Sequence, residues 1–211
     1  DPTCFVAGVP PWGKIGMMDG SVPEIFPFRG YRYNPLKFPA LEEVLTPPYD
    51  VISQKQQEAL YRKSPHNFVR LDLKKKSKTG EDIYKSAARD LKAWIRDGVF
   101  VPEERESFYI YDQTYKNLSR RPARRTGFIG LMKINPRMVK KHERTLEGPK
   151  EDRTRLLERL KANLSPIFGL FEDPAGKAQA EILAARRKKP VVDVRIEGVR
   201  HRLYLENDPA R

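Results

Sequence analysis

The stretch GEDIYKSAARDLKAWIRDG, residues 80–98, carries the strongest secondary-structure signal in the chain. Its apolar residues recur at three- and four-residue steps, which places them on one broad stripe of a helix. They are Ile83, Tyr84, Ala87, Ala88, Leu91, Trp94 and Ile95. We therefore predict a helix over residues 80–97 that ends at Gly98, with its stripe, including Tyr84 and Trp94, facing a core.

Extended segments are predicted on both sides of this helix. Residues 25–33 mix aromatic and β-branched side chains, and residues 67–73 alternate in the manner of a strand. Residues 107–115 and 126–134 are rich in aromatic and aliphatic side chains. The polar, arginine-rich residues 116–125 lie between them, so we predict a hairpin with a long, exposed basic loop.

The C-terminal third adds further elements. Residues 167–171 are predicted to form a short buried strand, and residues 191–196 to pair with residues 201–205 across a Glu197–Gly198 turn. Further helices are predicted over residues 53–61, 151–162 and 175–187. The mixture of helices and adjacent strands predicts an α/β (α+β) fold, with a mixed β-sheet, hairpins and three or more packing helices.

Length and composition suit one domain of ordinary size. The chain has 211 residues, 39% of them hydrophobic and 33% charged, and no apolar run long enough to cross a bilayer. Cys4 is the single cysteine, so no intrachain disulfide forms, which fits a reducing compartment. We expect a cytoplasmic protein with an irregular leader over residues 1–24 and a single domain over residues 25–211.

The basic charge is concentrated in the second half of the chain. Residues 1–105 hold 17 basic and 14 acidic side chains, and residues 106–211 hold 24 and 14, which gives the formal net charge of +13. The surplus includes basic runs at residues 120–125 and 186–189. Such a surplus attracts nucleic acid, nucleotides or anionic metabolites, and a merely solvated basic surface is the plainer alternative.

Familiar catalytic signatures are absent from the sequence. It contains no phosphate-binding loop of the Gly-x-x-x-x-Gly-Lys-Ser/Thr type, no Gly-x-Gly-x-x-Gly and no His-Glu-x-x-His. The histidines are His66, His142 and His201, and with one cysteine they do not make a structural zinc cluster. We expect no metal held by the protein alone.

The richest chemistry lies in the segments HERT (142–145) and PKEDR (149–153). Glu143, beside His142, suits a general base acting on a hydroxyl group. Lys150 and Arg153 suit a clamp on a phosphate near the N-terminus of the following helix. The alternative is a charged loop before a capped helix.

Two other compact clusters come earlier in the chain. PFRG (27–30) contributes Arg29, and PPYD (47–50) contributes Tyr49 and Asp50. These three side chains suit the wall of a pocket, although prolines and glycine also shape turns and Asp50 also suits a helix cap.

Together these clusters resemble one family, domain of unknown function 1015 (DUF1015), in its N-terminal part. The matching tags are PFRGYRY (27–33), PPYDVI (47–52), PHN (65–67), YIY (109–111), RTG (125–127), HERT (142–145), PKEDR (149–153) and NLSPIF (163–168). The likeness runs in the same order from residue 25 to the C-terminus, and the combination is specific although each tag alone is not.

The resemblance implies a prokaryotic protein whose relatives carry a later Asp-Gly-His-His-Arg segment, which does not occur here. That segment is similar to the nucleotide-binding core of ParB-like proteins and free-serine kinases. By this likeness His142–Glu143 supply the acidic catalytic residue, and the cofactor is a nucleotide such as ATP, ADP or CTP, with Mg²⁺. A missing C-terminal half or a partner chain is then expected to supply the residues that bind the phosphate groups.

Three functions stay open from the sequence. The first is a nucleotide-dependent phosphotransferase that acts on a small hydroxyl metabolite, with Glu143 in a shallow basic cleft. Its other residues are expected to be His142, Arg29, Tyr49, Asp50, Lys150 and Arg153. The second is a ParB-like, non-catalytic module that binds nucleotide or nucleic acid, although no recognition helix or aromatic platform for bases is visible. The third is an inactive remnant, and none of the three requires a membrane.

Overall fold

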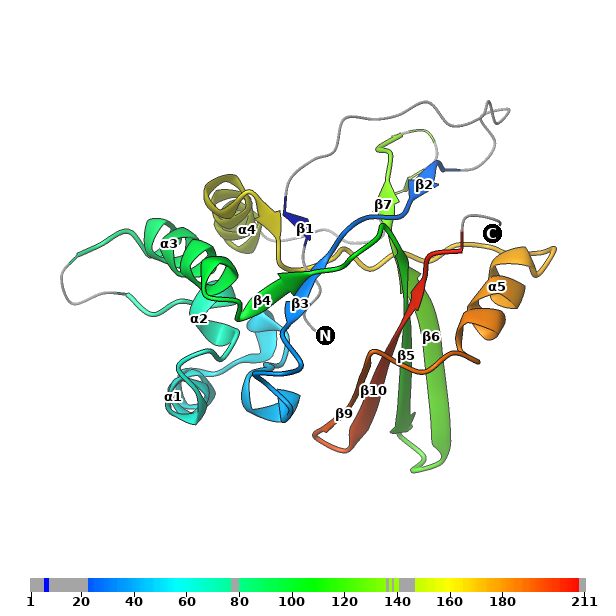
Figure 1. Ribbon diagram of the computed structural model, residues 1–211, viewed down its shortest axis with the longest axis horizontal. Coiled ribbons are helices and arrows are strands. Elements are labelled where there is room, and N and C mark those ends of the chain that lie inside the picture. Colours follow the sequence, from blue (N-terminus) through cyan, green and yellow to red (C-terminus); the bar gives the residue numbers. More distant parts are fainter. Residues whose placement is uncertain are drawn as a thin grey trace.

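A computed structural model describes residues 6–7, 23–76, 80–135, 137, 139–140 and 147–208. Two lobes lie side by side in Figure 1, with β3 and β4 crossing between them. The helical lobe holds helices α1 to α4, and the sheet lobe holds a four-stranded sheet with α5. The predicted α+β class is confirmed, and every described strand pair is antiparallel.

The bounds of the elements are as follows. The helices are α1 (Gln54–Lys63), α2 (Val69–Asp72), α3 (Ile83–Arg96), α4 (Glu147–Leu160) and α5 (Lys177–Ala185), with short 3-10 helices η1 (Leu41–Glu43) and η2 (Tyr49–Val51). The strands are β1 (Val6–Ala7), β2 (Ile25–Phe26), β3 (Tyr31–Tyr33), β4 (Phe100–Pro102), β5 (Phe108–Lys116), β6 (Pro122–Ile129), β7 (Leu131–Met132), β8 (Ala162–Asn163), β9 (Val192–Ile196) and β10 (Val199–Glu206).

Side-chain caps fix where the predicted helices begin. Ser53 forms a capping box with Gln56 at the start of α1. Asp82 accepts hydrogen bonds from two backbone N–H groups at the start of α3. The stripe of α3 faces the core as predicted, with Leu91 and Trp94 both buried.

The large sheet has the strand order β6-β5-β10-β9. The predicted hairpin is confirmed, but β5 and β6 pair as far as Lys116 opposite Pro122, so residues 117–121 alone form the turn. The side-chain oxygen of Asn117 accepts from the backbone N–H of Arg121 and closes that turn. Arg124 is therefore a strand residue. The second hairpin, β9 with β10, is also confirmed.

The two faces of this sheet have different neighbours. One face contributes Tyr109, Val194 and Leu203 to a core that also contains Leu91 and Trp94 of α3. The opposite face packs on α5 through a smaller cluster of Ile110, Ala185 and Tyr204. The main core therefore joins the two lobes, and α5 covers part of the outer face.

Two strand predictions are wrong. Within residues 67–73 the chain forms the short helix α2, because the Asn67 side chain accepts from the backbone N–H of Val69 and starts a helical turn. Residues 167–171 form no strand, and Ile167 and Leu170 are 94% and 86% exposed. This segment does not pair with the edge strand β6, whose described backbone partner is β5 alone, and it contacts β6 through side chains instead.

Most of the predicted leader, residues 1–24, lies outside the described residues. Within it Val6–Ala7 form β1, which pairs antiparallel with β8. No helix in the described ranges combines the length and apolarity that a membrane crossing requires.

Candidate functional site

An ion-pair cluster in the helical lobe centres on Arg153 in α4. Its Nη1 lies 2.6 Å from Oδ1 of Asp72, and its Nη2 donates to the Asp72 backbone carbonyl at 2.8 Å. On its other side, Nε donates to Asp152 Oδ2 at 2.9 Å. One guanidinium therefore holds two carboxylates, from the end of α2 and from α4, in a fixed geometry.

Tyr49 of η2 lies against the same guanidinium. The guanidinium carbon of Arg153 is 3.9 Å from the centre of the Tyr49 ring, which is a close cation–π contact. Two prolines precede Tyr49, and the fixed φ of Pro48 suits the turn into η2. Two residues that the sequence predicted to share a site, Tyr49 and Arg153, are in contact.

Two hydroxyl groups complete the cluster. Ser165 Oγ lies 3.4 Å from Asp72 Oδ1, and the Tyr84 hydroxyl donates to Asp152 Oδ1 at 2.8 Å. Segments from η2, α2, α3, α4 and the chain after β8 therefore meet around Arg153. We call the set Tyr49, Asp72, Tyr84, Asp152, Arg153 and Ser165 the Arg153 cluster.

Burial dominates the electrostatics of this cluster. Burial raises the pKa of Asp72, and the Arg153 guanidinium opposes that rise without cancelling it. Burial also raises the pKa of Tyr84, and its hydrogen bond to Asp152 adds to the effect. Two carboxylates against one guanidinium leave the cluster with a formal surplus of negative charge when both are ionised.

The other predicted site residues have different surroundings. Lys150 and Asp50 are exposed, and neither side chain makes an ion pair with a described residue. Lys150 stands one helical turn before Arg153. Arg29 is exposed and donates from Nε to the Glu103 carbonyl at 2.9 Å, and no described contact joins it to the Arg153 cluster.

The predicted catalytic pair, His142 and Glu143, lies outside the described residues. Glu143 precedes Glu147, the first residue of α4, by four positions. The predicted cleft shared by Glu143, Arg29 and Tyr49 therefore stays a prediction.

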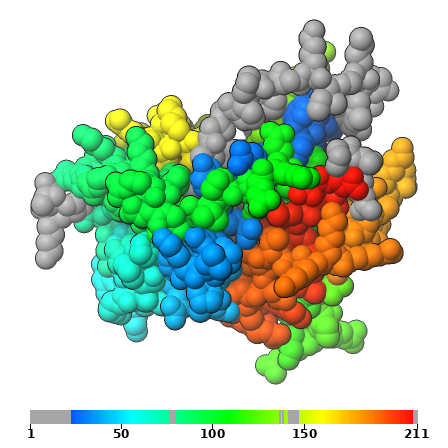
Figure 2. Space-filling view, in the orientation of Figure 1, coloured from blue at the N-terminus to red at the C-terminus, as the bar shows by residue number. Residues whose placement is uncertain are grey.

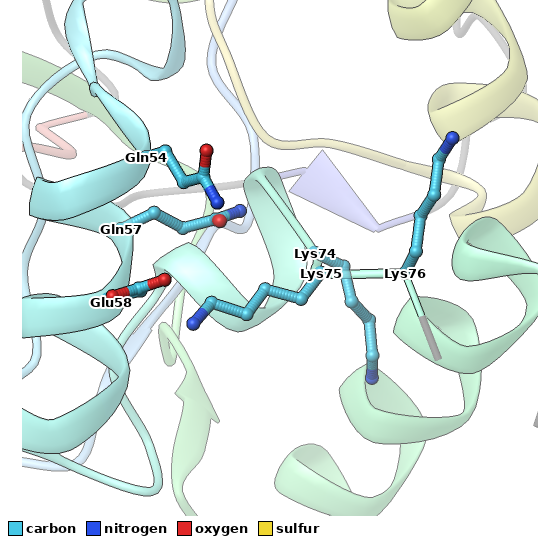
Figure 3. A pocket seen from close by; sticks show the side chains of 6 residues that line it. All are labelled: Gln54, Gln57, Glu58, Lys74, Lys75 and Lys76. Atoms are coloured by element: carbon cyan, nitrogen blue, oxygen red, sulfur yellow. The ribbon is translucent and has the colours of Figure 1, made fainter. Parts of the chain in front are cut away.

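An open hollow of about 380 Å³ lies between α1 and residues 74–76, a segment that follows Asp72 closely in the sequence. Its lining is polar and consists of Gln54, Gln57, Glu58, Lys74, Lys75 and Lys76. Figure 3 shows the three lysines pointing in three different directions. Lys74 pairs with Asp90, and the Lys75 ammonium lies 4.7 Å from the centre of the Tyr61 ring. Lys76 is exposed and forms no ion pair with a described residue, so its ammonium group is free to bind an anion.

Two of the early motifs have a structural explanation. Asn67 of PHN is fully buried, and its Nδ2 donates to the carbonyls of Glu43 and Leu45. Gly30 of PFRG donates its backbone N–H to the Tyr109 hydroxyl at 2.6 Å. Both residues form hydrogen bonds between segments that are distant in the sequence, so a structural role explains their presence in these motifs.

Sequence reasoning missed Asp72, Ser165 and the role of the Tyr84 hydroxyl. Asp72 fell in the segment wrongly predicted as a strand, and Tyr84 was assigned to packing alone. The only signal was the position of Asp72 beside the Lys74–Lys76 run and of Ser165 inside NLSPIF. Neither position indicates that the two side chains meet, because 93 residues separate them.

Comparison with known proteins gives one match. No curated protein and no solved structure matches the chain. The sequence profile of the family described as "Protein of unknown function (DUF1015)" matches residues 25–211, and no likeness to ParB-like proteins or serine kinases was found. Since that match covers most of the chain, the protein belongs to the DUF1015 family.

Proposed function

We propose that the chain binds a phosphorylated small molecule beside the Arg153 cluster and takes part in phosphoryl transfer from a nucleotide to a small hydroxyl compound, such as free serine. The observation that supports this proposal is the convergence of Tyr49, Asp72 and Asp152, from η2, α2 and α4, on the guanidinium of Arg153. Phosphoryl transfer depends mainly on positioning and charge, and this cluster fixes charged groups rigidly.

The proposal gives each residue a role that fits its contacts. Arg153 is already held by Asp72 and Asp152, so it positions the cluster and does not clamp phosphate itself. The exposed ammonium groups of Lys150 and Lys76 are the phosphate contacts. Glu143, four residues before α4, is the general base that accepts the hydroxyl proton.

The described residues do not by themselves fit a magnesium ion. No group of three or more histidine, cysteine or acidic side chains gathers among them. The carboxylates of Asp72 and Asp152 already accept hydrogen bonds from Arg153. Magnesium prefers several oxygen ligands in octahedral geometry, so we derive no step through it.

Nucleotide titrations test the proposal. ATP, ADP and CTP are added to the full chain and binding is measured by calorimetry. Lys150→Gln should weaken binding about tenfold or more, since a hydrogen bond to a charged group contributes roughly 1.5–3 kcal/mol. Lys92→Gln removes the same charge from an exposed position on α3 and should leave binding unchanged.

Turnover is followed by mass spectrometry of phosphorylated serine. Glu143→Gln should abolish any turnover while sparing nucleotide binding. Absence of binding at millimolar nucleotide would contradict the proposed function, and full turnover by Glu143→Gln would show that Glu143 is not the general base.

A further inference from the structure

A second charged cluster lies in the sheet lobe, around Asp112 of β5. Its carboxylate is fully buried and accepts from the Thr126 hydroxyl at 2.7 Å and from Arg202 Nη2 at 2.6 Å. The Nε atoms of Arg124 and Arg186 lie 3.5 and 3.4 Å from its Oδ1. Three arginines, from β6, the end of α5 and β10, therefore share one carboxylate.

The strand register places further positive charge on this face of the sheet. Side chains at paired positions, and at every second residue along a strand, share a face. The basic residues on the Asp112 face are Lys116, Arg124, Arg195, Arg200 and Arg202, joined by Arg186, the residue that follows α5. The acidic residues there are Asp112, Asp193 and Glu206, of which Asp193 is paired with Arg200 and Glu206 with Lys188. The surplus of basic groups makes this face attractive to anions.

Some polar atoms at this face have no hydrogen-bond partner among the described residues. They are Thr114 Oγ1, Arg186 Nε and Arg202 Nε, all buried, and Arg186 Nε still lies 3.4 Å from Asp112 Oδ1 as part of an ion pair. These atoms are shielded from solvent, so a ligand on this face contacts its exposed basic side chains instead. The surplus of basic groups therefore favours an anionic ligand over a neutral one.

Exposed aromatic rings lie along the edge strand β6. Arg125 lies over the Phe168 ring at 5.7 Å, and Phe171 meets Phe128 with ring centres 5.6 Å apart. Phe168 and Phe171 are 59% and 57% exposed. Strand alternation points Arg125 to the sheet face opposite Asp112 and Phe128 to the Asp112 face, so the two rings lie along the β6 edge, one toward each side of the sheet. Exposed rings beside arginines form the platform on which nucleic-acid bases stack.

The basic surface is extended rather than enclosed. It crosses four strands, each about 4.8 Å from the next. It continues to the exposed Arg120 and Arg121 in the β5–β6 turn, and Figure 2 shows the tip of this hairpin projecting at the lower edge. This shape suits a linear polyanion better than a small one.

We propose that the Asp112 face and the β6 edge bind single-stranded nucleic acid, with the exposed Arg124 and Arg195 on phosphates and Phe168 and Phe171 stacked on bases. A single strand fits because a duplex keeps its bases paired and away from the two rings. This activity is separate from the phosphoryl transfer proposed for the helical lobe and does not depend on it.

Fluorescence anisotropy tests the proposal with the full chain and labelled 20-nucleotide probes: oligo-uridine, oligo-thymidine and a DNA duplex. Both single strands should bind more tightly than the duplex, and the tighter of the two identifies RNA or DNA as the source. The logarithm of the association constant should fall linearly with the logarithm of KCl concentration, because binding of phosphates by arginines releases counterions. No binding of either single strand at low KCl overturns the proposal.

Variants separate charge from stacking. Arg124→Gln with Arg195→Gln should reduce the salt slope by about 1.4, at roughly 0.7 for each phosphate that is no longer neutralised. Phe168→Ala with Phe171→Ala should weaken single-strand binding about tenfold or more and leave the salt slope unchanged. Both rings are exposed, so this pair is not expected to disturb folding.

The matched control is Lys85→Gln with Lys92→Gln, which removes two exposed charges from α3. It should leave affinity and salt slope close to those of the native chain. An equal drop in slope for the control would mean that binding is spread over the whole basic surface. Unchanged binding by the phenylalanine pair, or tighter binding of the duplex, would also overturn the proposal.

Discussion

At the level of single residues, two buried aspartates organise the charges of this chain. Asp72 pairs with one arginine, which also holds Asp152, whereas Asp112 lies among three arginines. The first cluster therefore has a surplus of carboxylate and the second a surplus of guanidinium. Because a buried charge is costly unless it is paired, each aspartate fixes the positions of its arginines.

The raised pKa of Asp72 predicts a specific pH dependence. Its folded pKa lies above the ordinary value of 3.8 because the carboxyl is buried, so the folded chain binds this proton more tightly than the unfolded chain. Stability contributed by the protonated form is lost as pH rises from 3.8 through the raised pKa. The melting temperatures of the native chain and of Asp72→Asn are measured from pH 3.5 to 7. The melting temperature of Asp72→Asn minus that of the native chain should increase as pH rises, because the asparagine does not ionise.

Asp82 provides a control of opposite sign. Hydrogen bonds from the backbone N–H groups of Lys85 and Tyr84 lower its pKa below 3.8. Its contribution is present above that value and is lost as pH falls through the lowered pKa. The advantage of the native chain over Asp82→Ala should grow with pH. If the advantage of the native chain over Asp72→Asn also grew with pH, the Arg153 guanidinium would outweigh burial in setting the pKa of Asp72.

At the level of elements, agreement between local and tertiary signals decides which predictions succeed. The helix α3 has a cap at Asp82, a broad apolar stripe and a glycine at position 98 with φ of +64°, and all three agree. The four-residue helix α2 is too short for a helical period to show in the sequence. Its buried Val69 and Leu71 alternate as they would in a strand.

Truncation of Leu91 tests the packing of α3. Leu91 is 3% exposed in the core that joins the lobes, so Leu91→Ala should lower the free energy of unfolding by about 2–5 kcal/mol. Urea denaturation followed by circular dichroism measures this loss. The neighbouring Lys92→Ala, on the exposed side, should change it by less than about 0.5 kcal/mol. A similar small change for Leu91→Ala would place that side chain outside the core.

At the level of the whole molecule, one core joins the helical lobe and the sheet lobe. Leu203 of β10 and Trp94 of α3 belong to the same buried cluster, and Tyr33 belongs to it too, 6.4 Å from Trp94 by ring centres. Such a shared core favours a single cooperative unfolding transition over separate melting of the lobes.

This expectation is tested by loosening one lobe and observing the other. Leu203 is fully buried, so Leu203→Ala should cost about 2–5 kcal/mol. In a Trp12→Phe background, Trp94 is the remaining tryptophan and reports on the helical lobe. Its fluorescence midpoint should fall together with the midpoint from far-ultraviolet circular dichroism. A tryptophan midpoint that stays at its original denaturant concentration would show two independent units.

The sequence by itself determined the elements whose signal is local. The capped helices α1 and α3, the β9–β10 hairpin and the antiparallel partner strands β5 and β6 follow from periodicity, caps and turn residues. Its charge pattern also placed the basic surplus in the second half of the chain. For the candidate site, the sequence predicted one cleft shared by Glu143, Arg29, Tyr49, Asp50, Lys150 and Arg153. Of this set, the structure shows Tyr49 in contact with Arg153.

The tertiary structure alone decided which polar residues meet. Asp72 acquires its role because α4 brings Arg153 against it across 81 positions of sequence, and Asp112 gathers arginines from three elements. Phe168 was predicted to be buried and instead lies exposed beside Arg125. Periodicity reports whether a side chain faces a core, but a contact between distant residues depends on how whole elements pack, and no local pattern encodes that.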